Sequence, residues 1–496
     1  MNIAVCAAGR DTARAPRVLV VIACLGLAGA VGCSATSSAV VDSGPDSSAA
    51  PGPARALFEL PRADQPPPSG FYALPFPNDI RVAAETGRID MSDYIRPNAL
   101  ATLYVDAIAD NVRGFSPLAA GHLRFDGAID PASLPASPLD ATAEDAAVYL
   151  VNIDPLSPRR DERVPLRFRF SAAEGETIGA NWLAVLPYPG FVLAEQTTHA
   201  LIVTDRLRAG DGTPVTASPD FLAVLAPGAP DDDAAVVRAR QIYQPLLSWL
   251  DQPGGDERSS VVSAAVFTTQ DVTGLIGRVR QVIHDDLPAP TPRQIIRRID
   301  RSDYHWFDGL YDGPNFQQGE PPHVVAEAGG NIAVDEATGR PIIQRMEELR
   351  ISFTVPRSDM PERGWPVVIF SHGTGGSYHS FERSGVAGRL ARQGLAVLST
   401  DQVMHPPRVP PGSSPEVLFF NFLNPLAARD NTLQGAADLF QVVRLVRNFD
   451  ITERRPGGLR VRFDPDRVYF FGHSQGGLTG PPFLAHEPHV HAAVLS

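Results

Sequence analysis

The second half of the chain contains short, unbroken apolar runs, and segments with helical spacing lie between them. Residues 367–370 read Val-Val-Ile-Phe, and residues 395–400 and 467–471 are similar runs. An unbroken run is typical of a strand that is buried on both faces of a parallel sheet. Apolar residues at helical spacing predict helices over residues 381–393 and 431–448. The alternation predicts an α/β domain with a mostly parallel, doubly wound sheet over residues 348–496.

The preceding region has a different pattern, in which apolar and polar positions alternate. Residues 164–170 alternate strictly, and residues 147–151, 199–203 and 261–269 are further strand candidates. Short strands separated by turn dipeptides predict an all-β, immunoglobulin-like sandwich over residues 70–285. Helical segments over 233–250 and 271–284 interrupt this pattern. Residues 286–347 are rich in Pro and Gly, so we expect an irregular linker there.

The N-terminus has the pattern of a bacterial secretion signal. Arg10, Arg14 and Arg17 precede an apolar stretch over residues 18–29, which is too short for a comfortable membrane span. The stretch ends in Ala-Val-Gly-Cys33, which resembles a lipobox whose cysteine is lipidated and becomes the first residue after cleavage. Residues 1–33 are therefore predicted to be a lipoprotein signal peptide, with Cys33 as the lipidation site.

Two other interpretations of this segment stay open. Residues 21–24, Val-Ile-Ala-Cys24, fit the lipobox more closely but leave an apolar stretch of only about six residues, shorter than the ~7 that is usual. An ordinary signal could instead be cleaved after Ala30. The lipoprotein reading predicts a cell-envelope location, on the outer membrane, with plain secretion as the alternative.

Composition narrows the possibilities further. Residues 34–69 are rich in Ser, Ala, Pro, Asp and Gly, which predicts a disordered tether. Cysteine occurs only at positions 6, 24 and 33, so the rest of the chain has no disulfide and no cysteine metal site. All 43 basic residues are arginine, which excludes Schiff-base chemistry, a P-loop lysine and a Ser-Lys dyad. A net charge of −13 without a basic stripe makes nucleic acid a poor partner.

The candidate nucleophile is Ser474, which follows the predicted strand 467–471 in the sequence Gly472-His473-Ser474-Gln475-Gly476. In a G-x-S-x-G turn between a strand and a helix, the serine has a strained backbone and its hydroxyl projects from the edge of the sheet. The residues two before and two after the serine must be small to avoid clashes. Gly472 and Gly476 satisfy that requirement.

A glycine-rich loop about 100 residues earlier follows the predicted strand 366–371. It reads His372-Gly373-Thr374-Gly375-Gly376. Such a loop supplies one backbone N–H to an oxyanion hole, and the residue after the nucleophile supplies the other. We therefore expect the amides of Thr374 and Gln475 to be the donors, with His372 orienting the loop.

With these motifs, residues 366–496 resemble an α/β-hydrolase from its β3 strand to its β6 strand. Over residues 70–496 the chain is similar to a bacterial family of virulence-factor lipases with a distinct N-terminal domain, which includes a surface-exposed lysophospholipase. Besides the elbow, the narrower resemblance rests on residues 74–79 (Leu-Pro-Phe-Pro-Asn-Asp), residues 420–422 (Phe-Asn-Phe), residues 429–431 (Arg-Asp-Asn) and Gln434. It implies a lipid or other ester substrate and no cofactor.

The remaining triad members are not evident. In α/β-hydrolases an acid and then a histidine follow the serine, but only 22 residues follow Ser474. His486, Glu487 and His489 among them are expected to be a solvated helix end rather than a dyad or a metal site. We expect the acid and the base to lie beyond residue 496. The connection 401–429 is either an acyl pocket or lid, or a packed connector.

The sequence thus predicts a serine carboxylic-ester hydrolase that forms an acyl-enzyme on Ser474. The alternative is a surface-anchored sandwich module that binds a partner and carries an inactive or incomplete hydrolase domain. A peptidase or a polyester depolymerase is a third possibility, because a fold does not fix a substrate.

Overall fold

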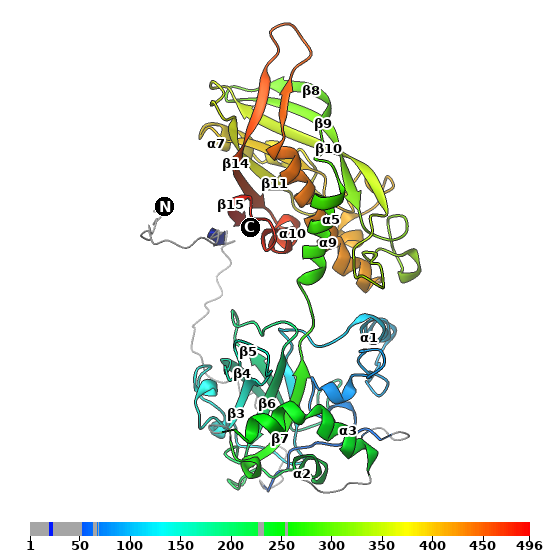
Figure 1. Cartoon of the computed structure of the whole chain (residues 1–496), viewed down its shortest axis with the longest axis vertical. Coiled ribbons are helices and arrows are strands. Elements are labelled where there is room, and N and C mark those ends of the chain that lie inside the picture. Colours follow the sequence, from blue (N-terminus) through cyan, green and yellow to red (C-terminus); the bar gives the residue numbers. More distant parts are fainter. Residues whose placement is uncertain (1–18, 23–51, 63–66, 68, 227–232, 253–255) are drawn as a thin grey trace. The chain divides into compact units, whose positions relative to one another are not determined.

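The computed structural model describes residues 19–22, 52–62, 67, 69–226, 233–252 and 256–496 (Figure 1). The chain divides into two units at Val272 and Thr273. The N-terminal unit is Val31–Val272, and the C-terminal unit is Thr273–Ser496 together with Met1–Ala30.

The N-terminal unit contains two three-stranded antiparallel sheets, with strand orders β2-β5-β4 and β3-β6-β7. Their strands are β2 (Gly121–Arg124), β3 (Val148–Asn152), β4 (Leu166–Ser171), β5 (Trp182–Pro187), β6 (Thr198–Thr204) and β7 (Val261–Thr268). The helices in the described part of this unit are α1 (Ala99–Asn111), α2 (Pro219–Leu225), α3 (Ala234–Ile242) and α4 (Gln244–Leu250), with short 3₁₀ turns η1 (Phe71–Ala73), η2 (Asp79–Arg81), η3 (Pro131–Ser133), η4 (Asp140–Thr142) and η5 (Arg258–Ser260).

The expectation of an all-β unit is wrong, because helices form one of its layers. All five residues of β3 are buried. Leu150 on one face packs in a core with residues of the other sheet, such as Leu183. Tyr149 on the opposite face packs with helix residues such as Phe221 of α2. A strand buried on both faces needs a cover on each side, so sheet β3-β6-β7 lies between a sheet and helices.

The predicted tether 34–69 is also too long. Residues 54, 56, 58 and 60 are almost fully buried in this unit, and Ala56 forms a β-bridge with Phe125. Alternate positions are therefore buried, as in a strand. Proline and glycine around this short pattern obscured it in the sequence.

The C-terminal unit is an α/β fold built on a nine-stranded sheet with the order β1-β15-β14-β11-β12-β10-β9-β8, and β13 pairs with β14. Strands β1, β15, β14, β11 and β12 pair in parallel, and β10, β9 and β8 continue the sheet antiparallel. The strands are β1 (Leu19–Ile22), β8 (Arg293–Asp300), β9 (Tyr304–Asn315), β10 (Arg345–Pro356), β11 (Trp365–Ser371), β12 (Ala396–Thr400), β13 (Asp450–Thr452), β14 (Arg460–Gly472) and β15 (Val490–Leu495).

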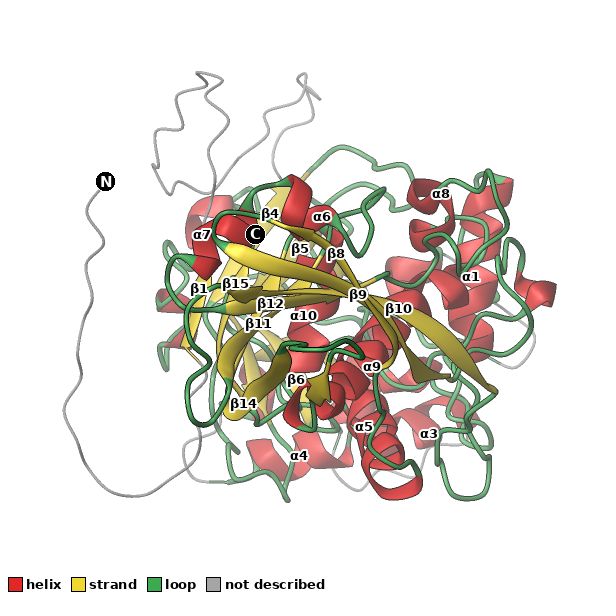
Figure 2. Ribbon diagram, turned by 90° about the horizontal axis from the view of Figure 1, so that it is seen from above, coloured by secondary structure: helices red, strands yellow, loops and turns green. Residues whose placement is uncertain are grey.

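Helices cover both faces of this sheet (Figure 2). One face packs on α5 (Gly274–Asp286), α9 (Pro425–Arg447) and α10 (Gln475–Leu484). The other packs on α6 (Ser380–Arg383) and α7 (Val386–Ala391). These two short helices replace the single predicted helix 381–393, because the chain turns at Gly385 with a φ of 75°. The remaining helices are α8 (Pro415–Phe420) and the 3₁₀ turn η6 (Ala326–Ala328).

The predicted linker 286–347 is irregular only in part: β8 and β9 within it belong to this sheet, whereas residues 316–344 form turns, isolated bridges and η6. The unit begins at residue 273 rather than 348. Phe307 and Tyr311 of β9 are fully buried. Gly309 in the middle of β9 is one of the glycines that made this region look irregular in the sequence. A Cβ atom there would meet the end of the Ile295 side chain on β8, so glycine lets that side chain pack closely on the strand.

Only Leu19–Ile22 of the predicted signal peptide is described. Its backbone pairs in parallel with β15 as strand β1. Cys33 lies outside the described residues. In the described part of the chain, no helix is both long and apolar enough to cross a membrane.

Candidate active site

The candidate site lies where the strand order of the parallel sheet reverses. After β11 the chain passes to β12 on one side, and it later returns to β14 on the other side of β11. The connections that leave β11 and β14 therefore run to opposite faces, α6 and α7 to one and α10 to the other. The crevice between such connections, at the carboxyl ends of the strands, is where open α/β sheets bind ligands.

Ser474 occupies a sharp turn between β14 and α10. Its φ of 52° and ψ of −112° are strained for a residue with a side chain, and the residue is exposed. A Cβ on Gly472 would overlap the carbonyl oxygen of Gly476, and a Cβ on Gly476 would overlap that of Ser371. The turn thus has the strained serine and the two side-chain-free flanks that the sequence predicts.

The glycine-rich loop, residues 372–376, lies directly against this turn. A Cβ on Gly373 would be 3.0 Å from the Cβ of Ser474. The Thr374 hydroxyl donates a hydrogen bond to the Gln475 carboxamide oxygen at 3.0 Å. Within the described residues, neither the Thr374 nor the Gln475 backbone N–H has a hydrogen-bond partner. Both amides are therefore available to a ligand beside Ser474.

His372 holds the start of this loop as a neutral imidazole. Its Nδ1 donates to the Gly373 carbonyl at 2.8 Å, so its Nε2 can accept the backbone N–H of Gln402 at 3.2 Å. The ring is fully buried. Burial lowers the pKa of His372 to about 3, with a smaller contribution from His405 that also lowers it, while the bond to Gly373 opposes the shift. A histidine held in this form orients backbone and does not serve as a general base.

Two residues of this site were not predicted from the sequence. Gln402 and His405 follow β12, next to β11 in the sheet. His405 Nε2 accepts the N–H of Gly375 at 3.0 Å, and its Nδ1 donates to the Val403 carbonyl at 3.1 Å. Burial lowers the pKa of His405 as well. The available signal was the position of these polar residues directly after a buried parallel strand.

His473 and the connection 401–429 also border the site. The backbone N–H of His473 donates to the Ser371 carbonyl at 2.9 Å, and the residue is exposed. Within the connection, Phe419 packs in a small core with Val403, whereas Phe422 is 67% exposed. One part of the connection is thus a packed connector, and another part presents apolar side chains to solvent.

The histidines near the end of the chain lie away from Ser474. Residues 486–489 follow α10 and precede β15, so they lie at the opposite edge of the sheet, about 15 Å away by the length of a ten-residue helix. Glu487 is 1% exposed and accepts a hydrogen bond from Arg280 of α5 at 3.3 Å. The expected solvated helix end is therefore wrong for Glu487, which anchors α5.

None of the described histidines or carboxylates is hydrogen-bonded to the Ser474 hydroxyl. A cluster of three or more His, Cys, Asp or Glu that could hold a metal ion is likewise absent from the described part of the chain.

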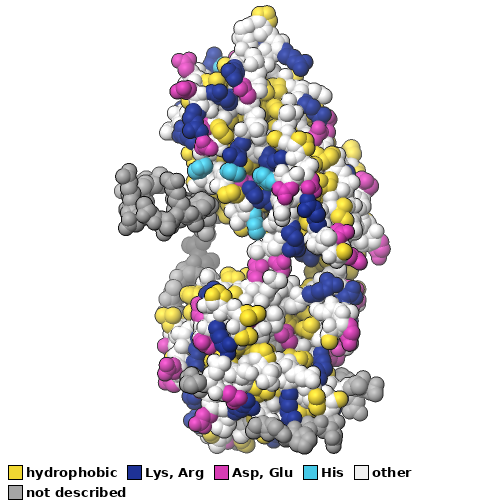
Figure 3. Space-filling view, viewed as in Figure 1, with side chains coloured by type: hydrophobic (Ala, Val, Ile, Leu, Met, Phe, Trp, Pro, Cys, Tyr) yellow, Lys and Arg dark blue, Asp and Glu magenta, His cyan; other side chains and the backbone are white. Residues whose placement is uncertain are grey.

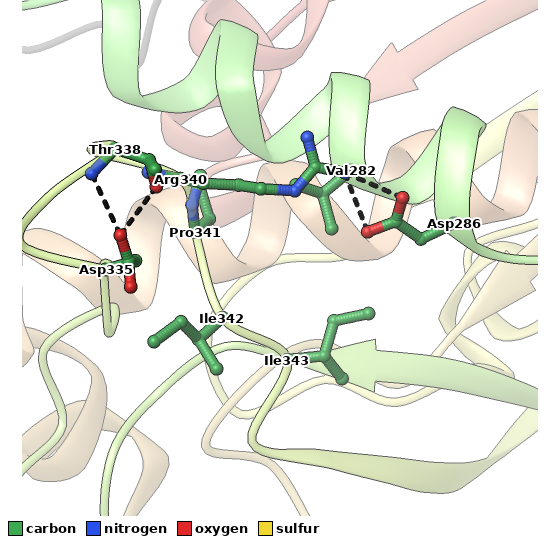
Figure 4. Close-up of a pocket in the computed structure, with 8 residues that line it drawn as sticks. All are labelled: Val282, Asp286, Asp335, Thr338, Arg340, Pro341, Ile342 and Ile343. Carbon is green, nitrogen blue, oxygen red and sulfur yellow. Dashed lines mark hydrogen bonds and ion pairs between the residues drawn. The ribbon is translucent and has the colours of Figure 1, made fainter.

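A hollow with a volume of about 440 Å³ between α5 and residues 335–343 is a separate feature of the C-terminal unit. Arg340 and Asp286 form an ion pair across its wall, and Asp335 bonds its own turn at Thr338 (Figure 4). None of its lining residues belongs to the elbow or the glycine-rich loop.

On the face shown in Figure 3, arginines and carboxylates are interspersed rather than gathered into a basic stripe.

No family model matches the chain, and no curated protein matches it. Among solved structures, it is similar to an acetyl xylan esterase from Paenibacillus sp. R4, with 17% identity and a TM-score of 0.29 over 45% of this chain and 58% of that one. A second is an S-formylglutathione hydrolase from Agrobacterium tumefaciens, with 15% identity and a TM-score of 0.22 over 40% and 60%.

A third is a putative dienelactone hydrolase from Klebsiella pneumoniae subsp. pneumoniae MGH 78578, with 22% identity and a TM-score of 0.22 over 30% and 54%. The chain therefore spans a little more than half the length of each of these proteins. The strand order of the sheet and the geometry of the elbow define the fold.

Proposed function

We propose that the protein is a serine carboxylic-ester hydrolase of the α/β-hydrolase fold, with Ser474 as its nucleophile. The carrying observation is the strained Ser474 backbone, with φ 52° and ψ −112°, between two glycines that have no room for a side chain. A strained serine at the carboxyl end of a central strand exposes its hydroxyl to a substrate. A serine in an ordinary surface turn needs neither the strain nor the two glycines.

The proposed reaction has two steps. The Ser474 oxygen attacks the ester carbonyl while its proton passes to a base, and the tetrahedral intermediate then expels the alcohol to leave an acyl-enzyme. Water next attacks this acyl group and releases the acid. The amides of Gln475 and Thr374 stabilise the oxyanion in each step. Gln475 is also the first residue of α10, whose N-terminal dipole favours negative charge there.

We further propose a lipid ester as the substrate and attachment to a membrane through an acylated Cys33, on the outer membrane. Support for the substrate comes from the resemblance to lipases and from the apolar side chains of α8 and the residues after it. Val417 and Phe422 there are well exposed, and the Glu416 carboxylate lies beside Gly375 of the glycine-rich loop. An apolar acyl chain is a suitable ligand for such a surface.

The proposal is tested by hydrolysis of p-nitrophenyl esters of two, four, eight and sixteen carbons, with the protein expressed from its whole reading frame. We expect hydrolysis that Ser474→Ala abolishes. Ser384→Ala, which changes an exposed serine at the C-terminal end of α6, serves as the matched control and should keep full activity. Folded protein without esterase activity would favour the alternative, a surface-anchored binding module.

A further inference from the structure

We propose that Gln402 is a positioning residue that fixes the distance between the two amide donors of the oxyanion hole. The inference rests on the proposed function, because it assigns a role within that site. Gln402 does not touch the reacting atoms. It acts through Gln475 and His372, which belong to the two segments that supply the donors.

A one-directional chain of hydrogen bonds joins these segments. The Thr374 hydroxyl donates to the Gln475 carboxamide oxygen at 3.0 Å, and the Gln475 carboxamide nitrogen donates to the Gln402 carboxamide oxygen at 3.3 Å. The Gln402 carboxamide nitrogen in turn donates to the His372 carbonyl. Each carboxamide accepts at its oxygen and donates at its nitrogen, so no other orientation of either group keeps the chain intact.

A second hydrogen bond joins Gln402 to the glycine-rich loop, residues 372–376. The backbone N–H of Gln402 donates to His372 Nε2 at 3.2 Å, and His372 Nδ1 donates to the carbonyl of Gly373. Gln402 is 5% exposed and Gln475 is 1% exposed, so water cannot readily replace a lost partner. The side chain and the backbone of one residue thus hold both ends of His372.

Without this series of hydrogen bonds, the backbone amides of Gln475 and Thr374 would not be held equally firmly. The Gln475 amide is fixed by β14, by α10 and by the contacts of Gly472 and Gly476. The Thr374 amide lies in a loop with three glycines, and Gly375 has a φ of 74° that favours glycine. Bonds from the Gly375 N–H to His405 and from the Gly476 N–H to the His372 carbonyl hold the backbone on either side of Thr374. Loss of the Gln402 carboxamide should therefore shift Thr374 without releasing the loop, and leave Gln475 in place.

A displaced donor weakens the transition state more than the bound ester. An oxyanion hole acts on the charge that develops during the reaction, and removal of one donor lowers kcat by about 10²–10³-fold. A donor that is shifted and still present should cost less, about 10–100-fold in kcat, with KM within about twofold of the wild type.

The test compares Gln402→Leu with Gln441→Leu. Gln441 is a buried glutamine of α9 (2% exposed) whose carboxamide donates to the Asp312 carbonyl, outside the site. We expect Gln402→Leu to lower kcat for p-nitrophenyl butyrate and to weaken binding of an alkyl trifluoromethyl ketone, which forms a tetrahedral oxyanion on the serine. Gln441→Leu should lower stability and leave both values unchanged per folded molecule.

Gln402→Glu adds a readout that a purely structural role would not move. A protonated glutamic acid has the shape of glutamine and can donate to the His372 carbonyl, whereas the carboxylate cannot. We expect the ratio of kcat in Gln402→Glu to kcat in the wild type to rise as the pH falls from 8 to 5.5.

The outcomes separate the two proposals. An inactive wild type that the trifluoromethyl ketone does not bind would overturn the proposed function itself. An active wild type with an equally active, folded Gln402→Leu would overturn only the role of Gln402. The role of Gln402 would also be overturned if Gln441→Leu lost as much kcat per folded molecule as Gln402→Leu. It would be overturned as well if the ratio of kcat in Gln402→Glu to kcat in the wild type did not change with pH.

Discussion

Each unit of the molecule buries a neutral histidine, and the two histidines have different kinds of partner. His199 of the N-terminal unit bonds the carbonyl of Thr197, two residues away, and stacks on Phe267 of the neighbouring strand. His372 of the C-terminal unit bonds Gly373 and also Gln402, which belongs to the connection after a different strand. His199 thus bonds a residue of its own segment, whereas His372 joins the connections that follow β11 and β12.

The difference follows from the direction of the strands. In the antiparallel sheets of the N-terminal unit, neighbouring strands end at opposite edges, so the connections that follow them do not gather at one edge. In the parallel part of the C-terminal unit, β11, β12 and β14 all end at one edge. Three connections therefore bring His372, Gln402 and Ser474 together. The parallel strands of the C-terminal unit thus place the candidate chemistry in that unit.

The largest effect is expected from closing the space at the elbow. In Gly476→Ala, the new Cβ would overlap the Ser371 carbonyl, a backbone atom that cannot turn aside. We expect about 4–5 kcal/mol lower stability of the C-terminal unit and no esterase activity. In the N-terminal unit, Gly121→Ala meets only the end of the Leu201 side chain, so we expect about 1–3 kcal/mol. Urea unfolding of both variants measures the contrast, and equal losses would contradict it.

The next largest difference in stability between the two units is expected when an ion-paired arginine is replaced in each. Arg408 of the C-terminal unit has a 6% exposed side chain and pairs with Asp438 and Glu347. Arg408→Met leaves the buried Asp438 without its cationic partner and removes one of the two arginines that pair with Glu347, and we expect about 3–5 kcal/mol lower stability. Arg206 of the N-terminal unit has a 32% exposed side chain in its pair with Asp256, so Arg206→Met should cost about 1 kcal/mol. Thermal or urea unfolding distinguishes these values, and a larger loss in Arg206→Met would be the contrary result.

A feature of this protein could be predicted from the sequence where its signal lies within a short segment, and could not where it depends on the pairing of distant strands. The elbow and the glycine-rich loop were predictable, because an apolar strand and closely spaced glycines lie within ten residues of each other. Gln402 was not, because only the pairing of β12 with β11 brings it to His372. Strand β9 was missed because the Pro and Gly content of residues 286–347 indicated an irregular segment, and the pairing of β9 with β8 and β10 is not visible in the sequence. The helical layer of the N-terminal unit was undervalued, although β3 is apolar on both faces.

The last prediction concerns how His199 and His372 make the stability of their units depend on pH. Burial lowers the pKa of His199 to about 4 and that of His372 to about 3, whereas an unfolded histidine has a pKa of ~6.5. Above pH ~6.5 both states are neutral and neither histidine contributes to the pH dependence. As the pH falls below that value, the unfolded chain binds a proton that the folded unit does not. Each of these two histidines should therefore make its unit lose up to about 1.4 kcal/mol of stability per pH unit, in addition to what other histidines with a lowered pKa contribute, such as His405.

This contribution should end near pH 4 for His199 and near pH 3 for His372. His199→Gln and His372→Asn should each reduce the slope of their own unit by that amount, as followed by urea unfolding between pH 7 and 5. An unchanged slope in the variant would show that the histidine is already charged when folded.

The central claim is that Ser474 is an activated nucleophile, and covalent labelling tests it most directly. The protein from its whole reading frame is incubated with an alkyl fluorophosphonate, and the peptide that carries Ser474 is identified by mass spectrometry. We predict one phosphonate per molecule, on Ser474, and none in folded Ser474→Ala. Folded protein that stays unlabelled, or a label that persists in Ser474→Ala, would contradict the account.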